Sequence, residues 1–303
     1  MKEGIGTFIA IVIFFGGLAI LSLFCAGAVS KESNAEITDL EKNIIKVEDM
    51  QVLPENEGKL VLVSGTAKKD EELVDADFNI TVNTILLYRK VEMYQWKEVE
   101  TWNKEDKEYK YTYSKVWTEN LIDDTLFKYK HGIISESHIN PKNKPYESKL
   151  IYGTVELGEF KLSNDQIKSI KTDSIFEELS TEVATNMGMV ISEHYYTTVD
   201  KTPEIGDIRI SFLTVDSTKY KNITVLAKQK DNTFEEFKVD NSTPAGKMTN
   251  DVYDGIWSQA DIIASRNEEG EGYKTFFHIV AVILMIPIIL AAKNTFAKKT
   301  ENY

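Results

Sequence analysis

The chain has 303 residues, enough to bury a core of its own, and its formal net charge at pH 7 is -13. An acidic surface repels phosphate groups, and the lysines and arginines are scattered along the sequence, so nucleic acid is excluded as an expected partner. The single cysteine, Cys25, excludes an intramolecular disulfide, so the chain must be held together by packing.

The first predicted element is a transmembrane helix at residues 5–29, an apolar run without a charged side chain. At 1.5 Å per residue, about 25 residues give about 37 Å of helix, more than the ~30 Å hydrocarbon core of a bilayer. A cleaved signal peptide is the alternative, because Ala26-Gly27-Ala28 has the small-x-small form of a cleavage site. The apolar run is about twice as long as a usual signal-peptide core, which favours a retained anchor.

For residues 30–275 the sequence predicts a β-rich α+β domain with a few amphipathic helices. A short amphipathic stretch from Ile37 to Val47 is followed by segments rich in β-branched and aromatic residues. Strands are expected at residues 59–65, 78–82, 85–96, 109–117, 190–198, 207–215 and 222–229, with a strand pair within 151–160. The charged turn at residues 103–107 predicts a hairpin between the two strands beside it.

Three short helices are predicted within this domain. Ser163 and Gln166 have the spacing of a capping box, and Ser174 and Glu177 repeat it. A last amphipathic helix is expected at residues 251–265. Residues 57–61 and 204–210 also resemble each other, so the domain could consist of two related β units.

The second predicted transmembrane helix covers residues 276–292, and Pro287 is expected to kink it. Lys2 lies at one chain end, and Lys293, Lys298 and Lys299 lie at the other. Because lysines near a membrane favour the cytoplasmic side, residues 1–4 and 293–303 are predicted to be cytoplasmic. Residues 30–275 would then lie outside the cell or in an organelle lumen.

Catalytic and metal-binding patterns are absent from the sequence. The four histidines, His131, His138, His194 and His278, do not have the spacing of a zinc site, and no nucleophile elbow or phosphate-binding glycine loop occurs. His131 and His138 lie in a polar segment that we expect to be a solvated loop. The sequence therefore predicts no catalytic residue, no cofactor and no metal.

An aromatic cluster is the most distinctive feature of the central domain. Tyr111, Tyr113 and Trp117 alternate along one predicted strand, so their side chains should project from one sheet face. The neighbouring strand contributes Tyr94 and Trp96. If this face is exposed, we expect it to bind a partner or a membrane interface. If it is buried, it forms the core between the sheet and a helix.

Two sequence blocks carry a family resemblance. The first block is Val91-Glu92-Met93-Tyr94-Gln95-Trp96, followed by Tyr111-Thr112-Tyr113 and Trp117. The second block is residues 203–212, which include Gly206, Asp207 and Arg209. With these blocks the chain resembles the LUMA family, that is, transmembrane protein 43 and its bacterial relatives. The residues singled out as an interaction or core motif are Met93, Tyr94, Trp96, Tyr111, Tyr113, Trp117, Gly206, Asp207 and Arg209.

The resemblance implies a non-enzymatic protein of the endoplasmic reticulum and inner nuclear membrane in animals, which self-associates and binds lamins and emerin. Bacterial relatives would lie in the plasma membrane. Animal members have a further pair of spans, so the nuclear-envelope role is the part of the resemblance that this sequence supports least. The leading hypothesis is a membrane-anchored scaffold that binds other membrane proteins or itself, as a homo-oligomer. An envelope- or lipid-processing enzyme and an accessory subunit of a membrane complex are the alternatives.

Overall fold

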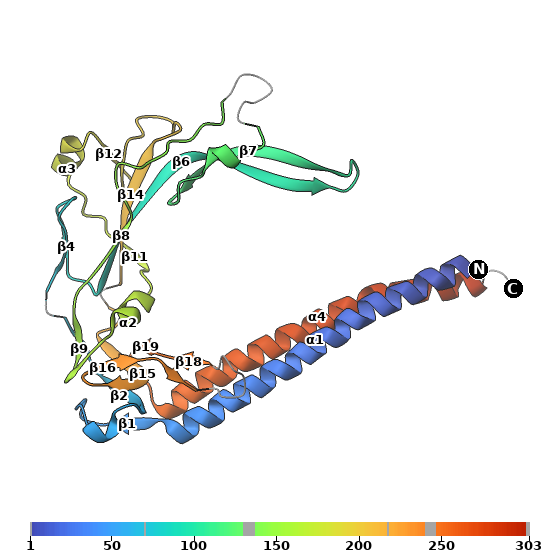
Figure 1. The fold of residues 1–303 in the computed structure, drawn as a ribbon, viewed down its shortest axis with the longest axis horizontal. Helices are drawn as coiled ribbons and strands as arrows, with labels where there is room; N and C mark the ends of the chain where they lie inside the picture. The colour runs from blue at the N-terminus through green and yellow to red at the C-terminus, as the bar shows by residue number, and fades with distance from the viewer. Residues whose placement is uncertain (1, 70, 130–136, 217, 240–246, 301–303) are drawn as a thin grey trace. The chain divides into compact units, whose positions relative to one another are not determined.

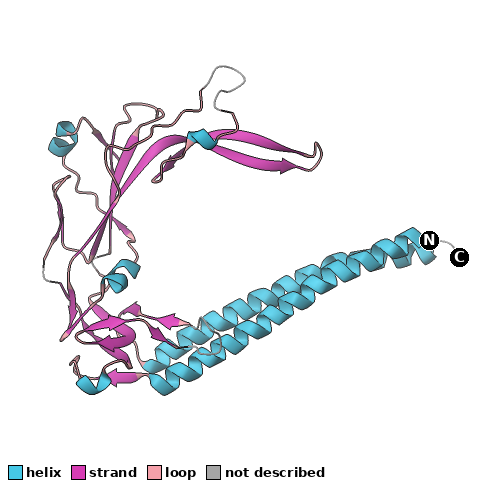
Figure 2. Cartoon of the chain, in the orientation of Figure 1, coloured by secondary structure: helices cyan, strands magenta, loops and turns pink. Residues whose placement is uncertain are grey.

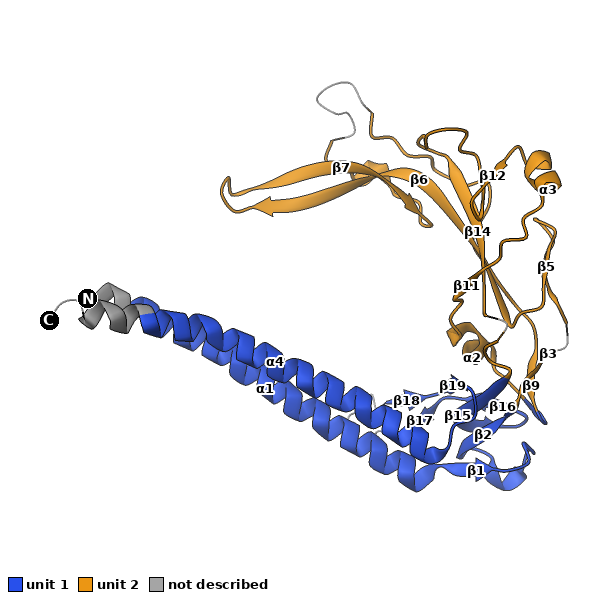
Figure 3. Ribbon diagram, turned by 180° about the vertical axis from the view of Figure 1, so that it is seen from behind, with its two compact units in different colours: residues 1–65, 158–160, 222–303 blue, residues 66–157, 161–221 orange. Residues whose placement is uncertain are grey.

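A computed structural model of the chain describes residues 2–69, 71–129, 137–216, 218–239 and 247–300. Long helices lie at the two ends of the chain and strands dominate between them (Figure 2), which confirms the α+β class. The chain divides into two compact units (Figure 3). Unit 1 comprises residues 1–65, 158–160 and 222–303, and unit 2 comprises residues 66–157 and 161–221.

Unit 1 contains the two long helices, α1 (Lys2–Asn43) and α4 (Gln259–Thr300), each of 42 residues. They lie side by side and antiparallel, with both chain ends at the same end of the pair (Figure 1). The hydroxyl of Ser22 donates a hydrogen bond of 2.7 Å to the carbonyl of Phe277 on the other helix. Large apolar side chains such as Ile13 and Phe24 point outward. Both helices are long and apolar enough to span a membrane.

Each helix is longer than the predicted membrane segment. Helix α1 continues beyond residue 29 to Asn43 and takes in most of the expected amphipathic stretch. Helix α4 begins at Gln259 and runs without a break through Pro287. The helix predicted at residues 251–265 is wrong in its first part, because Asp251–Asp254 forms strand β19, which pairs with the strand at residues 222–230.

A five-stranded sheet lies where the two helices meet the rest of unit 1. Its strands are β1 (Ile45–Val47), β2 (Leu60–Thr66), β15 (Asn222–Lys230), β16 (Thr233–Glu235) and β19. Strand β1 follows α1 almost directly and pairs in parallel with β2. Leu40 of α1 and Ile262 of α4 are fully buried in one apolar cluster with side chains of the sheet. Both helices are thereby anchored to the sheet.

The remaining elements of unit 1 are short. They are the 3-10 helix η1 (Pro54–Asn56) and the strand pair β17 (Phe237–Lys238) and β18 (Met248–Thr249). Strand β10 (Phe160–Lys161) begins in unit 1 and ends in unit 2. Gly158 has a φ of +63° and sits against the backbone of Met50, a position that no larger residue fits.

Unit 2 is built on a seven-stranded sheet with the order β12-β13-β14-β6-β7, in which β11 also pairs with β14 and β8 also pairs with β6. Its longest strands are β6 (Leu86–Asn103) and β7 (Glu108–Thr118), which form the predicted hairpin. The other strands are β8 (Lys149–Tyr152), β11 (Ser174–Ile175), β12 (Val190–Ser192), β13 (Tyr195–Thr197) and β14 (Ile208–Thr214).

Short elements complete unit 2. Strand β3 (Lys68–Lys69) pairs with β9 (Val155–Leu157), and β4 (Leu73–Asp75) pairs with β5 (Ile80–Val82). The helices are η2 (Asp124–Leu126), α2 (Asn164–Ser169) and α3 (Thr181–Asn186). The capping box of Ser163 and Gln166 at the start of α2 is confirmed.

The core of unit 2 lies on one face of the seven-stranded sheet. The ring of Phe78 packs 5.4 Å from that of Phe212 and 5.8 Å from that of Tyr196. The hydroxyl of Tyr196 accepts a hydrogen bond from the backbone of Ser180, the N-cap of α3. Met93 is buried in the same cluster. Aromatic packing and the hydrogen bond to the N-cap of α3 therefore stabilise the core on this face of the sheet.

One local prediction in unit 2 is wrong. Residues 174–175 form an edge strand on β14 instead of the start of a helix, and α3 begins only after its N-cap, Ser180. Here a partner distant in sequence outweighs the local pattern. The strand pair predicted within 151–160 is confirmed, because β9 and β10 are paired neighbours in one small sheet, while β8 pairs with β6.

Candidate interaction surface

The register of β6 and β7 places the aromatic side chains on one face of the hairpin. Tyr94 lies opposite Trp117, and Trp102 lies opposite Tyr109. Side chains two residues apart in a strand share a face, and so do directly opposed residues. This aromatic face carries Tyr94, Trp96, Trp102, Tyr109, Tyr111, Tyr113 and Trp117.

Arg209 lies at the base of the aromatic face, opposite Glu92 in the β14–β6 register. Its Nε donates a hydrogen bond of 2.8 Å to Oε2 of Glu92. Its guanidinium carbon lies 4.7 Å from the ring centre of Trp117 and 4.9 Å from that of Tyr195, which are cation–π distances. The guanidinium therefore joins strands β6, β7, β13 and β14.

The carboxylate of Glu92 is nearly buried. Burial alone would raise its pKa, but the hydrogen bonds from Arg209 and from Lys90, at 3.0 Å, outweigh it and lower the pKa. Glu92 is therefore ionised at neutral pH. A carboxylate with a lowered pKa is a poor general acid, and this one serves to hold Arg209.

Gly206 and Asp207 form the turn that leads into β14. Gly206 has a φ of +100°, which favours glycine, and its N–H donates to the carbonyl of Tyr94 at 2.9 Å. The carboxylate of Asp207 accepts hydrogen bonds from the Thr198 hydroxyl at 2.8 Å and from the Glu204 N–H at 2.7 Å. These two residues fix the start of β14, which sets the position of Arg209.

Trp96 is buried beneath a segment that we call the covering segment, residues 119–129 and 137–141. His138 contacts the Trp96 ring edge-on at 4.7 Å between ring centres. The side-chain amide of Asn140 pairs with both backbone groups of Trp96, at 2.7 Å and 2.9 Å. Strand β14 does not reach Trp96, because it begins at Ile208, opposite Met93. Asn140 therefore takes the place of a neighbouring strand for the Trp96 backbone.

Tyr113 lies further out and is also covered. Its ring stacks on His138 at 3.9 Å between centres, and its hydroxyl donates to Glu98 and accepts from the Tyr129 N–H. Burial and, second, the bond to Glu98 raise the pKa of Tyr113 to about 12, so it stays protonated. The ring of Tyr111 meets that of Tyr129 edge-on, with 5.9 Å between ring centres, and the ammonium group of Lys128 lies 5.9 Å from the Tyr111 ring centre.

The far end of the hairpin, residues 99–112, is exposed, and we call it the outer hairpin. Trp102 and Tyr109 pack edge-to-face at 4.9 Å, yet their exposed fractions are 48% and 55%. Within the described residues, neither strand of the outer hairpin pairs with a third strand. Free strand edges next to an exposed aromatic pair are typical of surfaces that bind a partner.

The structure divides the predicted motif into four parts. Five residues meet at the hairpin base, namely Tyr94, Trp117, Gly206, Asp207 and Arg209. Trp96 and Tyr113 lie under the covering segment, Tyr111 lies on the outer hairpin, and Met93 points into the core. The aromatic face is therefore partly core and partly surface.

The solvated loop expected around His138 is wrong, since His138 is buried between Trp96 and Tyr113, while His131 lies outside the described residues. Asn140 was not singled out by the sequence reasoning. The sequence could have pointed to Asn140 only through the need for a hydrogen-bond partner for backbone groups of β6 where no neighbouring strand lies.

The described part of the chain contains no group of three His, Cys, Asp or Glu side chains that could hold a metal ion. Four polar side chains on the aromatic face are held by hydrogen bonds to one another or to the covering segment, namely Glu92, Arg209, Glu98 and Tyr113. This arrangement favours rigid support of the outer hairpin and binding at its exposed end.

Comparison with known proteins identifies a family. The family model described as Transmembrane protein 43 matches residues 93–298, which include all nine residues of the predicted motif. Transmembrane protein 43 of Rattus norvegicus is 28% identical over 290 residues, covering 89% of this chain and 69% of that protein. The Homo sapiens protein is 29% identical over 229 residues, covering 70% of this chain and 54% of its own length.

The Drosophila melanogaster homolog is 28% identical over 170 residues, covering 52% of this chain and 43% of its own length. The matched part of the chain therefore covers between 43% and 69% of the length of these relatives. No solved structure matches significantly.

Proposed function

The chain belongs to the transmembrane protein 43 family, a family of membrane proteins not known as enzymes, and from this membership we propose that it is a membrane-anchored scaffold. Helices α1 and α4 anchor it in the bilayer. The region between them binds other membrane proteins or further copies of the chain, without catalysis. The host membrane is the plasma membrane in a bacterium, and the endoplasmic reticulum or inner nuclear membrane in a eukaryote.

The antiparallel packing of α1 and α4 is the observation that carries this proposal. The two helices run antiparallel, with both chain ends at one end of the pair (Figure 1). As two membrane spans they would return the chain to the side on which it began, so the region between them would lie on the other side. The lysines near both chain ends favour the cytoplasm for the ends. The strands of both units would then face the cell exterior or an organelle lumen.

We expect Lys104 and Lys293 to be accessible from opposite sides of the membrane. Cysteines are introduced singly at these positions in a Cys25→Ala background and labelled with a membrane-impermeant maleimide in intact cells or sealed vesicles. Lys104→Cys should react from outside or from the lumen, and Lys293→Cys only after the membrane is opened. Labelling of both cysteines from one side would contradict the topology.

The outer hairpin is the surface that we assign to partner binding. It combines an exposed aromatic pair, which supplies much contact area, with free backbone donors and acceptors along two strand edges. The inner part of the hairpin is held rigid by Arg209 and the covering segment, so binding here orders few further groups. Low ordering cost favours affinity.

We expect a photo-crosslinking amino acid at Trp102 to capture proteins in cells. The control position is Val190 in β12, whose exposed fraction is also 48% but which lies outside the hairpin. Purified adducts are identified by mass spectrometry, and adducts with the same chain report self-association. Equal yields from both positions, or adducts with lipids alone, would contradict a scaffold that acts through this surface.

The double substitution Trp102→Ala/Tyr109→Ala should abolish capture from a crosslinker placed at Lys104. It should lower the free energy of unfolding by no more than about 1 kcal/mol, because both side chains are half exposed and lose mainly their contact with each other. Val99→Ala is the matched control, since Val99 is similarly exposed on the opposite face of the hairpin.

A further inference from the structure

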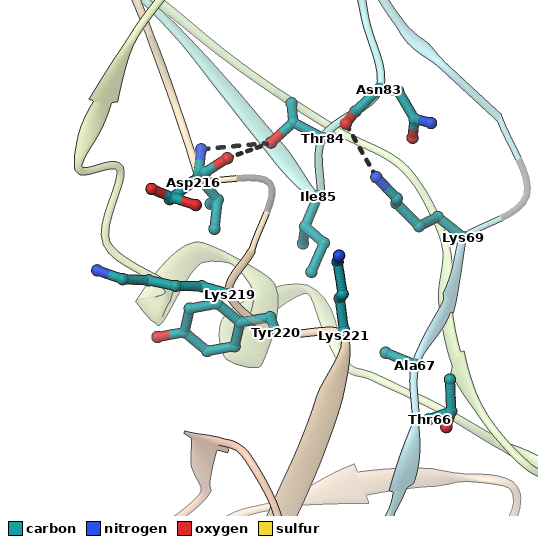
Figure 4. A pocket seen from close by; sticks show the side chains of 11 residues that line it. Thr66, Ala67, Lys69, Asn83, Thr84, Ile85, Asp216, Lys219, Tyr220 and Lys221 are labelled. Atoms are coloured by element: carbon teal, nitrogen blue, oxygen red, sulfur yellow. Dashed lines mark hydrogen bonds between the residues drawn. The ribbon is translucent and has the colours of Figure 1, made fainter.

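Unit 2 contains a cavity of about 380 Å³ that neither the hairpin nor the proposed scaffold role uses. Three lysines, Lys69, Lys219 and Lys221, line it together with apolar side chains that include Ile85 and Val215 (Figure 4). The lysines come from two segments far apart in the sequence, one after β2 and one after β14. They converge although the chain as a whole is strongly acidic.

Two of these lysines have no carboxylate partner in the described structure. The ammonium group of Lys69 donates to the backbone carbonyl of Asn83 at 3.0 Å, and burial lowers the pKa of Lys69. The ammonium group of Lys221 makes no hydrogen bond or ion pair with a described residue. Figure 4 shows the Lys221 side chain directed toward Ile85 and that of Lys69 toward Asn83. Both charges therefore remain available at the cavity.

The acidic groups nearby are already engaged. Asp173 is paired with Lys219, and it also accepts a hydrogen bond of 3.0 Å from the backbone of Asp216. Asp216 in turn accepts hydrogen bonds from the N–H and the hydroxyl of Thr218, at 2.7 Å and 2.6 Å. The uncompensated charge of the cavity is thus positive.

We propose that this cavity binds a phosphate monoester. The ammonium groups of Lys69 and Lys221 would bind the phosphate oxygens as point charges, and Ile85 and Val215 would contact the organic part of the ligand. Either a free phosphate ester or a lipid headgroup supplies this chemistry. The proposal is independent of the scaffold role, because it uses neither the hairpin nor the membrane topology.

The test is isothermal titration calorimetry on the full chain in detergent. One arm uses glycerol 3-phosphate as the free ester, and the other uses dihexanoyl phosphatidic acid. Dihexanoyl phosphatidylcholine, a zwitterionic phosphodiester without net charge, is the control for the second arm. Wild-type protein should bind one phosphate ligand, and Lys69→Met/Lys221→Met should weaken that binding at least tenfold. Preference for the ester or for the phosphatidic acid assigns the source of the ligand.

The matched control is Lys171→Met/Lys201→Met, which removes the same charge from two exposed lysines outside the cavity. Lys69→Arg/Lys221→Arg should keep most of the affinity and shows that loss in the methionine variant comes from lost charge and not from misfolding. No binding by the wild type, or equal loss in the control variant, would overturn the proposal.

Discussion

Replacing Arg209 with methionine is expected to lower the free energy of unfolding by about 3 kcal/mol, because the nearly buried carboxylate of Glu92 loses its main partner. Lys90 remains within 3.0 Å of Glu92 and keeps the loss near the lower end for a broken buried pair. The contacts of Arg209 with the rings of Trp117 and Tyr195 are lost as well. Thermal unfolding of the full chain in detergent should show unit 2 melting about 6 to 12 °C earlier.

Arg209→Lys separates charge from shape. Lysine keeps a positive charge beside Glu92 but lacks the planar guanidinium that stacks between two rings, so about half of the loss should return. The double variant Glu92→Gln/Arg209→Met should be more stable than Arg209→Met, since no buried charge is left unpaired. Equal stability of these two variants would show that the pair does not hold the hairpin base.

The difference between wild type and Arg209→Met should depend on pH. In the wild type the folded-state pKa of Glu92 is lowered, so its ion pair stabilises the fold above the unfolded-state pKa, and this contribution is lost as pH falls through the lowered value. Without Arg209, burial should raise the pKa of Glu92. Protonation of Glu92 then removes the unpaired buried charge that destabilises the variant. The gap between the two melting temperatures should therefore shrink as the pH falls from the raised pKa of Glu92 in the variant to its lowered pKa in the wild type, a range that includes the ordinary value of about 4.3. A gap that stays constant between pH 7 and pH 3 would exclude this electrostatic origin.

Gly270→Ala is expected to force α1 and α4 apart. A Cβ added at Gly270 would lie only 2.8 Å from the Cβ of Ser33 on α1, and rotating the serine hydroxyl away does not relieve this overlap. Overpacking of this kind costs about 1 to 3 kcal/mol. Thermal unfolding in detergent measures the loss, which should be reflected in earlier melting of unit 1.

Gly272→Ala is the matched control on the same helix. A Cβ at Gly272 meets no atom within 4 Å, so alanine should stabilise α4 by up to about 1 kcal/mol through its higher helix propensity. The pair Ser33→Gly/Gly270→Ala should recover most of the stability, because only one small side chain is then left where the two helices meet. If Gly270→Ala and Gly272→Ala behave alike, the helices do not pack at this point.

The sequence was most informative where one pattern is sustained over many residues. The apolar runs predicted both long helices. The charged turn at residues 103–107 between two strands predicted the hairpin, and the alternation of Tyr111, Tyr113 and Trp117 predicted the shared face. The capping box at Ser163 was also found from the sequence, because both of its partners lie within one turn. These features are decided by neighbours in the chain.

Prediction failed where a distant partner decides the structure. Ser174 has the same local pattern as Ser163, but the N–H of Phe176 donates to the carbonyl of Phe212 at 2.8 Å, which draws this segment onto the edge of β14. The two segments are separated by more than thirty residues in the sequence, so local spacing could not show the contact. Tertiary pairing overrides local propensity in such edge strands.

The candidate surface was recovered in its residues but not in its arrangement. The motif around Tyr94 and Arg209 was identified from the sequence, whereas its division into a charged base, a covered middle and an exposed end depends on the covering segment. His138 and Asn140 reach the hairpin from more than forty residues beyond Trp96. No spacing rule connects residues so far apart in a loop.

The length of α1 has a mechanical consequence in the proposed topology. Residues 30–43 continue the helix about 21 Å past the membrane segment and end in the buried contact of Leu40 with the sheet. A helix responds to a thinner or thicker bilayer by changing its tilt, and a 10° change would swing the end of this shaft sideways by about 4 Å. A change in membrane thickness would therefore displace the five-stranded sheet of unit 1 sideways.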